Sequence, residues 1–133
     1  ELSKPIMLDI LKIKTLCFDI DQVICVTKKN YYKISIPKKN TIKYINTLYD
    51  NGYIIKIFTA RYMGTYKENI SLIKKKYYKK TFNQLKKWRL KFHMLYMGKP
   101  SFDLFIDDKS LGYNKGWIKD LNKKLKEDKW KNV

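Results

Sequence analysis

Short apolar runs alternate with amphipathic segments along this chain, and this alternation limits its folds more than any other feature. Four runs are rich in aromatic and branched side chains, which is typical of buried strands: residues 15–20, 53–58, 92–97 and 102–106. Between the first two, the segment 41–50 places Ile42, Ile45 and Leu48 on one helical face, and Gly52 ends it. A strand, a helix and a second strand in this order predict a parallel sheet of the α/β class.

The remaining segments complete a single predicted domain. Three further segments have helical patterns: residues 66–78, 81–89 and 117–130. A polar turn between two apolar stretches predicts a β-hairpin, which we call the flap, over residues 22–36. The 133 residues can bury one sheet-centred core and leave little room for another, so we predict one domain over 1–133, with its core at about 14–130.

Polar side chains gather where the expected strands end. Carboxylates follow the first and fourth strands, a threonine and an arginine follow the second, and a lysine lies between the third and fourth: Asp19, Asp21, Thr59, Arg61, Lys99, Asp107 and Asp108. In open parallel sheets, ligands bind beyond the carboxyl ends of the strands. Carboxylates can hold a hard divalent cation, and a hydroxyl with a lysine can bind phosphate oxygens. The pattern therefore predicts a phosphate site.

Four segments carry a resemblance to a known family. In order they read LCFDIDQVI, IKIFTAR, GKP and LFIDD, from residue 16 to residue 108. They resemble the four motifs of the haloacid dehalogenase superfamily. The resemblance implies a Rossmann-like three-layer fold with a central parallel sheet. Two positions depart from the family pattern, because Gln22 stands where glycine is usual and Val23 where threonine is common.

The resemblance also implies a mechanism. Asp19 would attack phosphorus and form an aspartyl-phosphate intermediate, while Asp21 would protonate the leaving oxygen and then activate water. Thr59 would bond a phosphate oxygen, and Lys99 would neutralise the charge of the nucleophile and the phosphate. Arg61 could contact the substrate or brace its loop.

Further site roles follow from the same resemblance. The substrate-binding set would be Thr59, Ala60, Arg61 and Lys99. Magnesium would be held by the Asp19 carboxylate, the Asp21 carbonyl and the carboxylate of Asp108, with Asp107 supporting these ligands from outside. Mg²⁺ is therefore the expected cofactor, and the chain is expected to be a phosphoric monoester hydrolase.

The spacing of the motifs indicates a capless member of the superfamily. The spans from Asp19 to Thr59 and from Thr59 to Lys99 are used up by the flap, helices and strand already assigned. Specificity would then come from the flap, from a neighbouring subunit in a homo-oligomer, or from a large substrate. The segment 81–110 resembles small capless phosphatases of bacterial surface-polysaccharide synthesis, so a sugar phosphate is the expected substrate.

The formal net charge of +18 raises the alternative of a nucleic-acid partner. Arginine occurs only at Arg61 and Arg89, however, and lysine is spread over every segment, which is the pattern of AT-rich coding. Two alternatives stay open: a polynucleotide end phosphatase, and a catalytically idle basic binding or assembly protein.

The sequence also bears on location. No apolar run reaches the roughly 20 residues of a spanning helix, and the first residues lack a signal-peptide layout, so no membrane association and a cytoplasmic location are expected. Cys17 lies within an apolar run, where a small buried side chain is expected, and a reducing compartment is consistent with this.

Overall fold

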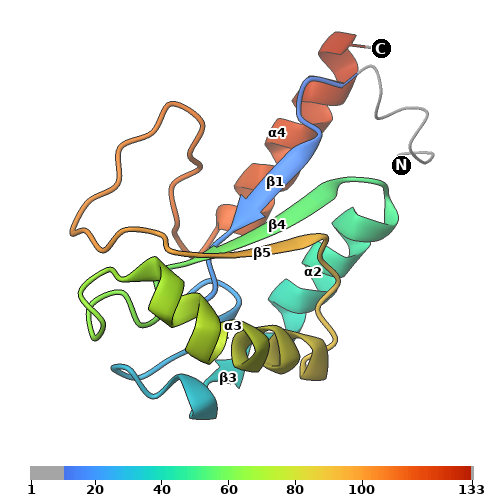
Figure 1. The fold of residues 1–133 in the computed structure, drawn as a ribbon. Helices are drawn as coiled ribbons and strands as arrows, with labels where there is room; N and C mark the ends of the chain where they lie inside the picture. The colour runs from blue at the N-terminus through green and yellow to red at the C-terminus, as the bar shows by residue number, and fades with distance from the viewer. Residues whose placement is uncertain (1–10, 133) are drawn as a thin grey trace.

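A three-stranded parallel sheet lies at the centre of the chain (Figure 1). The computed structural model describes residues 11–132, and the predicted domain limits of 1 and 133 lie outside these residues. The strands are β1 (Thr15–Phe18), β4 (Ile54–Thr59) and β5 (Met94–Met97), in the order β1-β4-β5. Both pairings are parallel. The α/β class and three of the four predicted strands are thereby confirmed.

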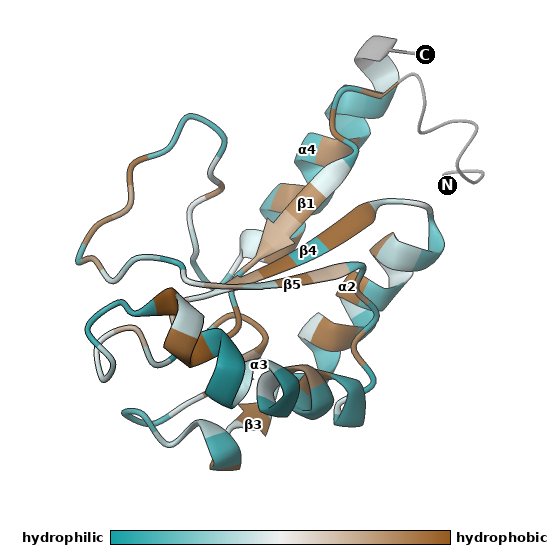
Figure 2. Ribbon diagram, in the orientation of Figure 1, coloured by the Kyte–Doolittle hydropathy of each residue, from teal (hydrophilic) through white to brown (hydrophobic). Residues whose placement is uncertain are grey.

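The strand β4 lies at the centre of the sheet because its apolar side chains are buried in the core. Ile55, Ile57 and Thr59 are fully buried, while the residues between them are only partly covered. Figure 2 shows β4 coloured as hydrophobic over most of its length, whereas hydrophobic and hydrophilic residues alternate along the helix α3. Burial of these branched side chains is the main stabilising contribution to such a core.

Three helices accompany the sheet: α2 (Lys39–Asp50), α3 (Ile70–Lys87) and α4 (Trp117–Asn132). In Figure 1, α2 and α3 lie on one side of the sheet and α4 runs alongside β1. The ring of Trp117 packs against Phe18 of β1, with 6.0 Å between the ring centroids. Gly52 follows α2 with φ 98°, as expected of the glycine that ends it.

The prediction of two helices over 66–78 and 81–89 is wrong, because α3 is one continuous helix. It begins after Asn69, whose side chain accepts the N–H of Leu72. Neither glycine nor proline interrupts the segment, and Ile73, Thr81 and Leu85 form one buried face across the expected break. A shared buried face and the absence of a breaker favour a single helix.

The flap is confirmed as a hairpin. Its strands β2 (Cys25–Val26) and β3 (Ile36–Pro37) pair antiparallel, and a 3₁₀ turn over Tyr32–Ile34 lies between them. The hairpin is held to the sheet end by the buried Ile20 carbonyl, which accepts the N–H groups of Ile24 and Cys25. The flap therefore stands beside the carboxyl end of β1.

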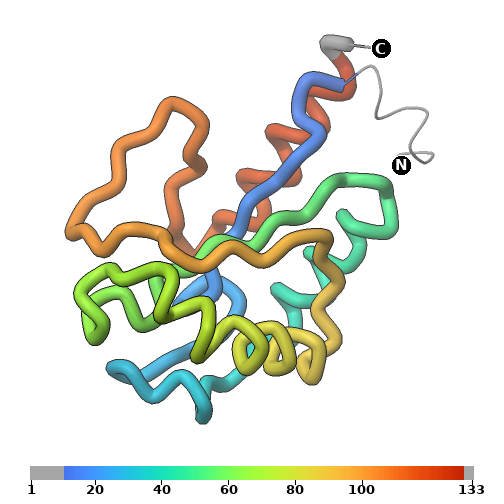
Figure 3. Tube along the Cα trace, in the orientation of Figure 1, coloured from blue at the N-terminus to red at the C-terminus, as the bar shows by residue number. Residues whose placement is uncertain are grey.

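The predicted fourth strand over 102–106 is not formed. These residues belong to an exposed loop over residues 98–116, which extends away from the sheet between β5 and α4 (Figure 3). Within residues 11–132, β1 is paired with β4 alone. Cys17 on β1 is consequently exposed, which corrects the expectation that it is buried. Apolar content predicts strand propensity, but a strand also needs a partner for its backbone groups.

The helices also bear on membrane association. Over residues 11–132, none of them is both long enough and apolar enough to cross a membrane.

Candidate active site

Asp19 and Lys99 meet at the carboxyl edge of the sheet. Asp19 follows β1, and Lys99 follows β5. The Lys99 Nζ lies 3.3 Å from the Asp19 Oδ2, with 18% of the lysine side chain and 35% of the aspartate side chain exposed. The backbone N–H of Lys99 donates to the carbonyl of Thr59 at the end of β4. Two of the predicted site residues are thus brought together, and both reach solvent.

The electrostatics of Asp19 depend on its partial burial. Burial raises the pKa of its carboxyl above the ordinary value of 3.8, while the Lys99 ammonium and the N–H of Ile20 act in the opposite direction. That N–H donates to the Asp19 Oδ1 at 2.8 Å. One carboxylate oxygen is therefore fixed by the backbone, and the other faces the lysine.

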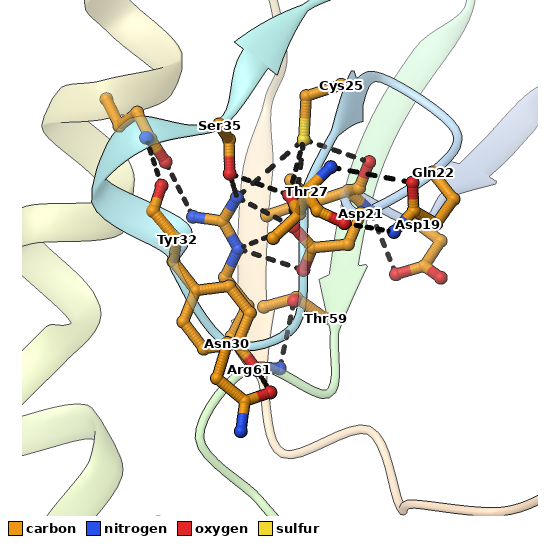
Figure 4. A network of polar contacts seen from close by, with 12 residues as sticks. Asp19, Asp21, Gln22, Cys25, Thr27, Asn30, Tyr32, Ser35, Thr59 and Arg61 are labelled. Carbon is orange, nitrogen blue, oxygen red and sulfur yellow. Dashed lines mark hydrogen bonds and ion pairs between the residues drawn. The ribbon is translucent and has the colours of Figure 1, made fainter.

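Asp21 points away from Asp19 and toward the flap (Figure 4). Its carboxylate accepts hydrogen bonds from the Nε and Nη2 of Arg61 at 2.9–3.1 Å and from the Thr27 hydroxyl at 2.5 Å. Only 21% of the Asp21 side chain is exposed. The predicted general acid is therefore held in a charge-assisted network.

Arg61 is one of the largest fully buried side chains of the described chain. Its Nη1 donates to the Gln84 side-chain oxygen at 2.5 Å, and its guanidinium lies 4.9 Å from the centre of the Tyr32 ring. Burial lowers the pKa of Arg61, but the hydrogen bonds and charge of Asp21 outweigh this, so the net direction is upward. Of the two roles that the sequence left open for Arg61, this placement favours bracing over contact with substrate.

The other two residues of the predicted substrate-binding set lie in the turn after β4. Thr59 is fully buried, and its hydroxyl accepts the N–H of Arg61 at 3.1 Å. Ala60 is partly buried against the core, and its carbonyl accepts the N–H of Met63. Both residues fix the turn that presents Arg61, and the Thr59 side chain has no exposed surface.

Gln22 takes the backbone conformation that glycine usually supplies. Its φ is 70°, in the left-handed region. The strained turn is stabilised by the Gln22 side chain, whose Nε2 donates to the Thr27 carbonyl at 2.6 Å. The Gln22 carbonyl in turn accepts from the Lys38 Nζ, which also donates to the Tyr113 hydroxyl. The departure from the family pattern is thus accommodated locally.

The predicted metal ligands are not assembled. Asp107 and Asp108 lie in the 98–116 loop, where Asp107 closes a turn by accepting the N–H of Lys109. Across residues 11–132, no three side chains of His, Cys, Asp or Glu come together as a metal site. In this arrangement Asp107 and Asp108 lie apart from Asp19 and Asp21, so the residues expected to hold a cation do not form one cluster.

Sequence reasoning missed the residues that bind Asp21 and Arg61 in the folded site. Thr27, Ser35 and Gln84 are common polar residues in a hairpin and on a helix, and nothing in their spacing marks them. Ser35 shares a 2.6 Å hydrogen bond with Thr27 and lies 3.4 Å from the Arg61 Nη2. Their role is visible only once the flap is folded against α3.

Comparisons with known proteins bear on the fold. No protein-family model matches the chain, and the curated proteins contain no significant match. The chain is similar to a target protein from Vibrio cholerae whose crystal structure is solved, with a TM-score of 0.70 and 25% identity. The similarity covers 84% of this chain and 98% of that one. It supports the mixed α/β fold over most of the described chain.

Proposed function

We propose that this chain is a phosphomonoester hydrolase of the haloacid dehalogenase type that acts through an aspartyl-phosphate on Asp19. The observation that carries the proposal is the pair formed by Asp19 and Lys99, which reaches solvent at the carboxyl edge of a parallel sheet. An ammonium beside a carboxylate lowers the repulsion that an anionic nucleophile meets on approaching a phosphate.

The residues divide the reaction between them. An oxygen of Asp19 forms a bond to phosphorus as the bond to the leaving oxygen breaks, and Asp21, once its carboxyl has turned from Arg61 toward the substrate, gives that oxygen a proton. Asp21 then takes a proton from water, which attacks the same phosphorus and releases inorganic phosphate from Asp19. Lys99 offsets the negative charge throughout.

Magnesium remains part of the proposal. A cation supplies Lewis-acid stabilisation of the phosphoryl oxygens when it is bound. Asp108 would serve as its ligand beside the Asp19 carboxylate and the Asp21 carbonyl, with Asp107 supporting these ligands from outside, and this requires the 98–116 loop to carry both residues to the sheet edge. The exposed run over 102–106 is suited to that change, since it would add a strand to β1 on the side that has no partner strand within residues 11–132.

A sugar phosphate is the substrate class that we favour. A shallow hollow of about 280 Å³ lies on the flap, lined by aromatic, amide and ammonium groups: Asn30, Tyr31, Tyr32, Lys33, Ile34 and Tyr62. Aromatic faces with a few polar groups suit a sugar ring. Tyr31 is 60% exposed there and can contact a ligand without rearrangement.

A polynucleotide end phosphatase is the second candidate. Helix α3 carries seven lysines and no acidic residue, and all seven are exposed: Lys74, Lys75, Lys76, Lys79, Lys80, Lys86 and Lys87. Such a surface can neutralise successive backbone phosphates. The open site would also admit the end of a chain.

Phosphate release from a panel of sugar phosphates, nucleotides and end-phosphorylated oligonucleotides tests the proposal. We expect hydrolysis with Mg²⁺, loss in EDTA, and recovery when Mg²⁺ is restored. Asp19→Asn removes the nucleophile and should abolish turnover while leaving the thermal melt unchanged. Normal turnover by Asp19→Asn would exclude the proposed nucleophile, and hydrolysis that persists without metal would exclude the cation.

A further inference from the structure

We propose that the groove between α2 and the C-terminal end of α3 is a second binding site, and that its ligand is a nucleoside diphosphate. The groove has a volume of about 560 Å³, which lies within the range of small-molecule sites. Asp19, Thr59 and Lys99 do not line it, so it is not part of the candidate active site. The inference goes beyond the proposed function and does not depend on it.

The two walls of the groove are tied together by hydrogen bonds. The Asn46 side chain on α2 donates to the Arg89 carbonyl at 2.9 Å and accepts the N–H of Lys91 at 2.8 Å. These bonds join α2 to the segment that follows α3. The spacing of the walls is therefore set by the protein before any ligand binds.

The groove carries positive charge on both walls. Two exposed cations stand on α2 and two at the end of α3: Lys39, Lys43, Lys87 and Arg89. None of these four has a carboxylate partner within residues 11–132. Asp50 also lines the groove, but its carboxylate is paired with the Lys91 ammonium at 2.7 Å. The groove is therefore complementary to a ligand with several negative charges.

Two features of these walls suit phosphate groups. Helix α2 begins at Lys39 without a side-chain cap and without an acidic residue in its first turn, so its N-terminal N–H groups leave positive partial charge beside that lysine. Arg89 carries a planar guanidinium, which can bind two phosphate oxygens at once. Cations on both walls favour two phosphates over one.

Trp88 supplies an aromatic surface next to these cations. It ends α3 and packs half-buried against the core, and the part of it that stays uncovered lines the groove. Aromatic side chains stack on the planar rings of nucleobases with little regard to the base. A nucleoside diphosphate carries such a ring and two phosphates in one small molecule, so it matches the aromatic and the cationic parts of the groove together.

Calorimetric titration of the full chain tests the inference, with ADP and UDP compared with their nucleosides and with pyrophosphate. EDTA is present so that metal-dependent hydrolysis does not disturb the measurement. We expect the tighter diphosphate to bind at least about tenfold better than its nucleoside or pyrophosphate, because it alone engages both Trp88 and the cations. Equal affinities for that diphosphate and pyrophosphate would overturn the inference. A single-stranded oligonucleotide that binds while ADP and UDP do not would overturn it too, in favour of a polynucleotide surface.

Arg89→Gly separates binding from folding. Arg89 has φ 62°, a left-handed conformation that glycine adopts without strain, so the variant should keep the thermal melt of the wild type. Its affinity for the diphosphate should fall about tenfold or more, since a charged two-point contact is lost. Lys67→Gly is the matched control, because Lys67 is exposed, has φ 49° and does not line the groove. Wild-type affinity in Arg89→Gly, or an equal loss in Lys67→Gly, would overturn the inference.

Two further variants locate the ligand. Trp88→Leu should reduce the affinity for the diphosphate to that for pyrophosphate, and Lys99→Met should leave it within about twofold of wild type. A loss in Lys99→Met without a loss in Arg89→Gly would place the nucleotide in the candidate active site and overturn the inference. These titrations do not use turnover, so a chain without phosphatase activity would sink the proposed function and leave the second site standing.

Discussion

The ammonium of Lys99 lies 3.3 Å from the carboxylate of Asp19, while the backbone N–H of the same lysine is bonded to the Thr59 carbonyl. The backbone of Lys99 is therefore fixed by the central strand β4, and its side chain reaches Asp19 at the end of β1. This anchoring places a positive charge beside a half-buried carboxylate.

Lys99→Met should raise the pKa of Asp19 further above 3.8. Burial already raises the pKa of Asp19, and the Lys99 ammonium lowers it. Removal of the ammonium therefore leaves the effect of burial with less to offset it, and the pKa rises. The nucleophile must be ionised, and a higher pKa leaves less of it ionised at a given acidic pH, so the acid limb of kcat/KM should move to higher pH. Carboxyl NMR, with the Asp19 signal assigned through Asp19→Asn, measures the shift without activity.

The matched control for this change is Lys91→Met. Lys91 pairs with Asp50 on the surface, so its substitution removes an equal charge elsewhere. Its Asp19 titration should overlay that of the wild type. An Asp19 titration that is the same in Lys99→Met and in the wild type would contradict the electrostatic coupling.

Gly98→Ala should destabilise the fold by about 1–3 kcal/mol. Gly98 has φ 91°, and an added Cβ would lie 3.0 Å from the Ile70 side chain at the start of α3. Gly64→Ala is the control, because nothing lies within 4 Å of its added Cβ, and it should stay within about 0.5 kcal/mol of wild type. Urea unfolding compares the two, and equal stabilities would show that Gly98 is not constrained.

The sheet could be predicted from the sequence because its strands are buried. The runs that became β1, β4 and β5 are apolar enough to identify, and β4 carries three fully buried side chains. The run over 102–106 has the same composition, yet it lies in the exposed loop. Apolar residues indicate that a segment can be buried, but they do not identify the partner that buries it.

The candidate site could be predicted in part for a similar reason. Asp19 and Lys99 follow strands, and the topology of a parallel sheet alone brings strand ends to one edge. The contact of Arg61 with Asp21 and Gln84 joins a strand end, a hairpin loop and a helix face. Such side-chain packing depends on the folded flap, so the sequence left the role of Arg61 open.

Leu104→Pro tests whether the 98–116 loop carries the acidic pair to Asp19. Leu104 is 78% exposed, so proline should leave stability within about 0.5 kcal/mol of wild type. If residues 102–106 add a strand to β1 when the cation binds, proline removes a ladder N–H and should abolish stimulation by Mg²⁺.

The control Leu111→Pro introduces proline at another position of the 98–116 loop and should keep the stimulation by Mg²⁺. Phosphate release titrated with Mg²⁺, beside a thermal melt, separates the two variants. Full stimulation in Leu104→Pro would show that a paired strand is not needed.

Salt dependence separates the two substrate classes. A sugar phosphate engages Asp19 and Lys99 locally, so its kcat/KM should change little between about 50 and 200 mM salt. An oligonucleotide end would engage the lysines of α3 as well, and its affinity should fall roughly a hundredfold or more over that range.

The double substitution Lys75→Glu and Lys79→Glu removes positive charge from the exposed side of α3. We expect it to leave sugar-phosphate kinetics unchanged, since neither lysine is part of the candidate site. Micromolar oligonucleotide binding with a steep salt slope that this variant abolishes, together with inert sugar phosphates, would instead establish the polynucleotide substrate.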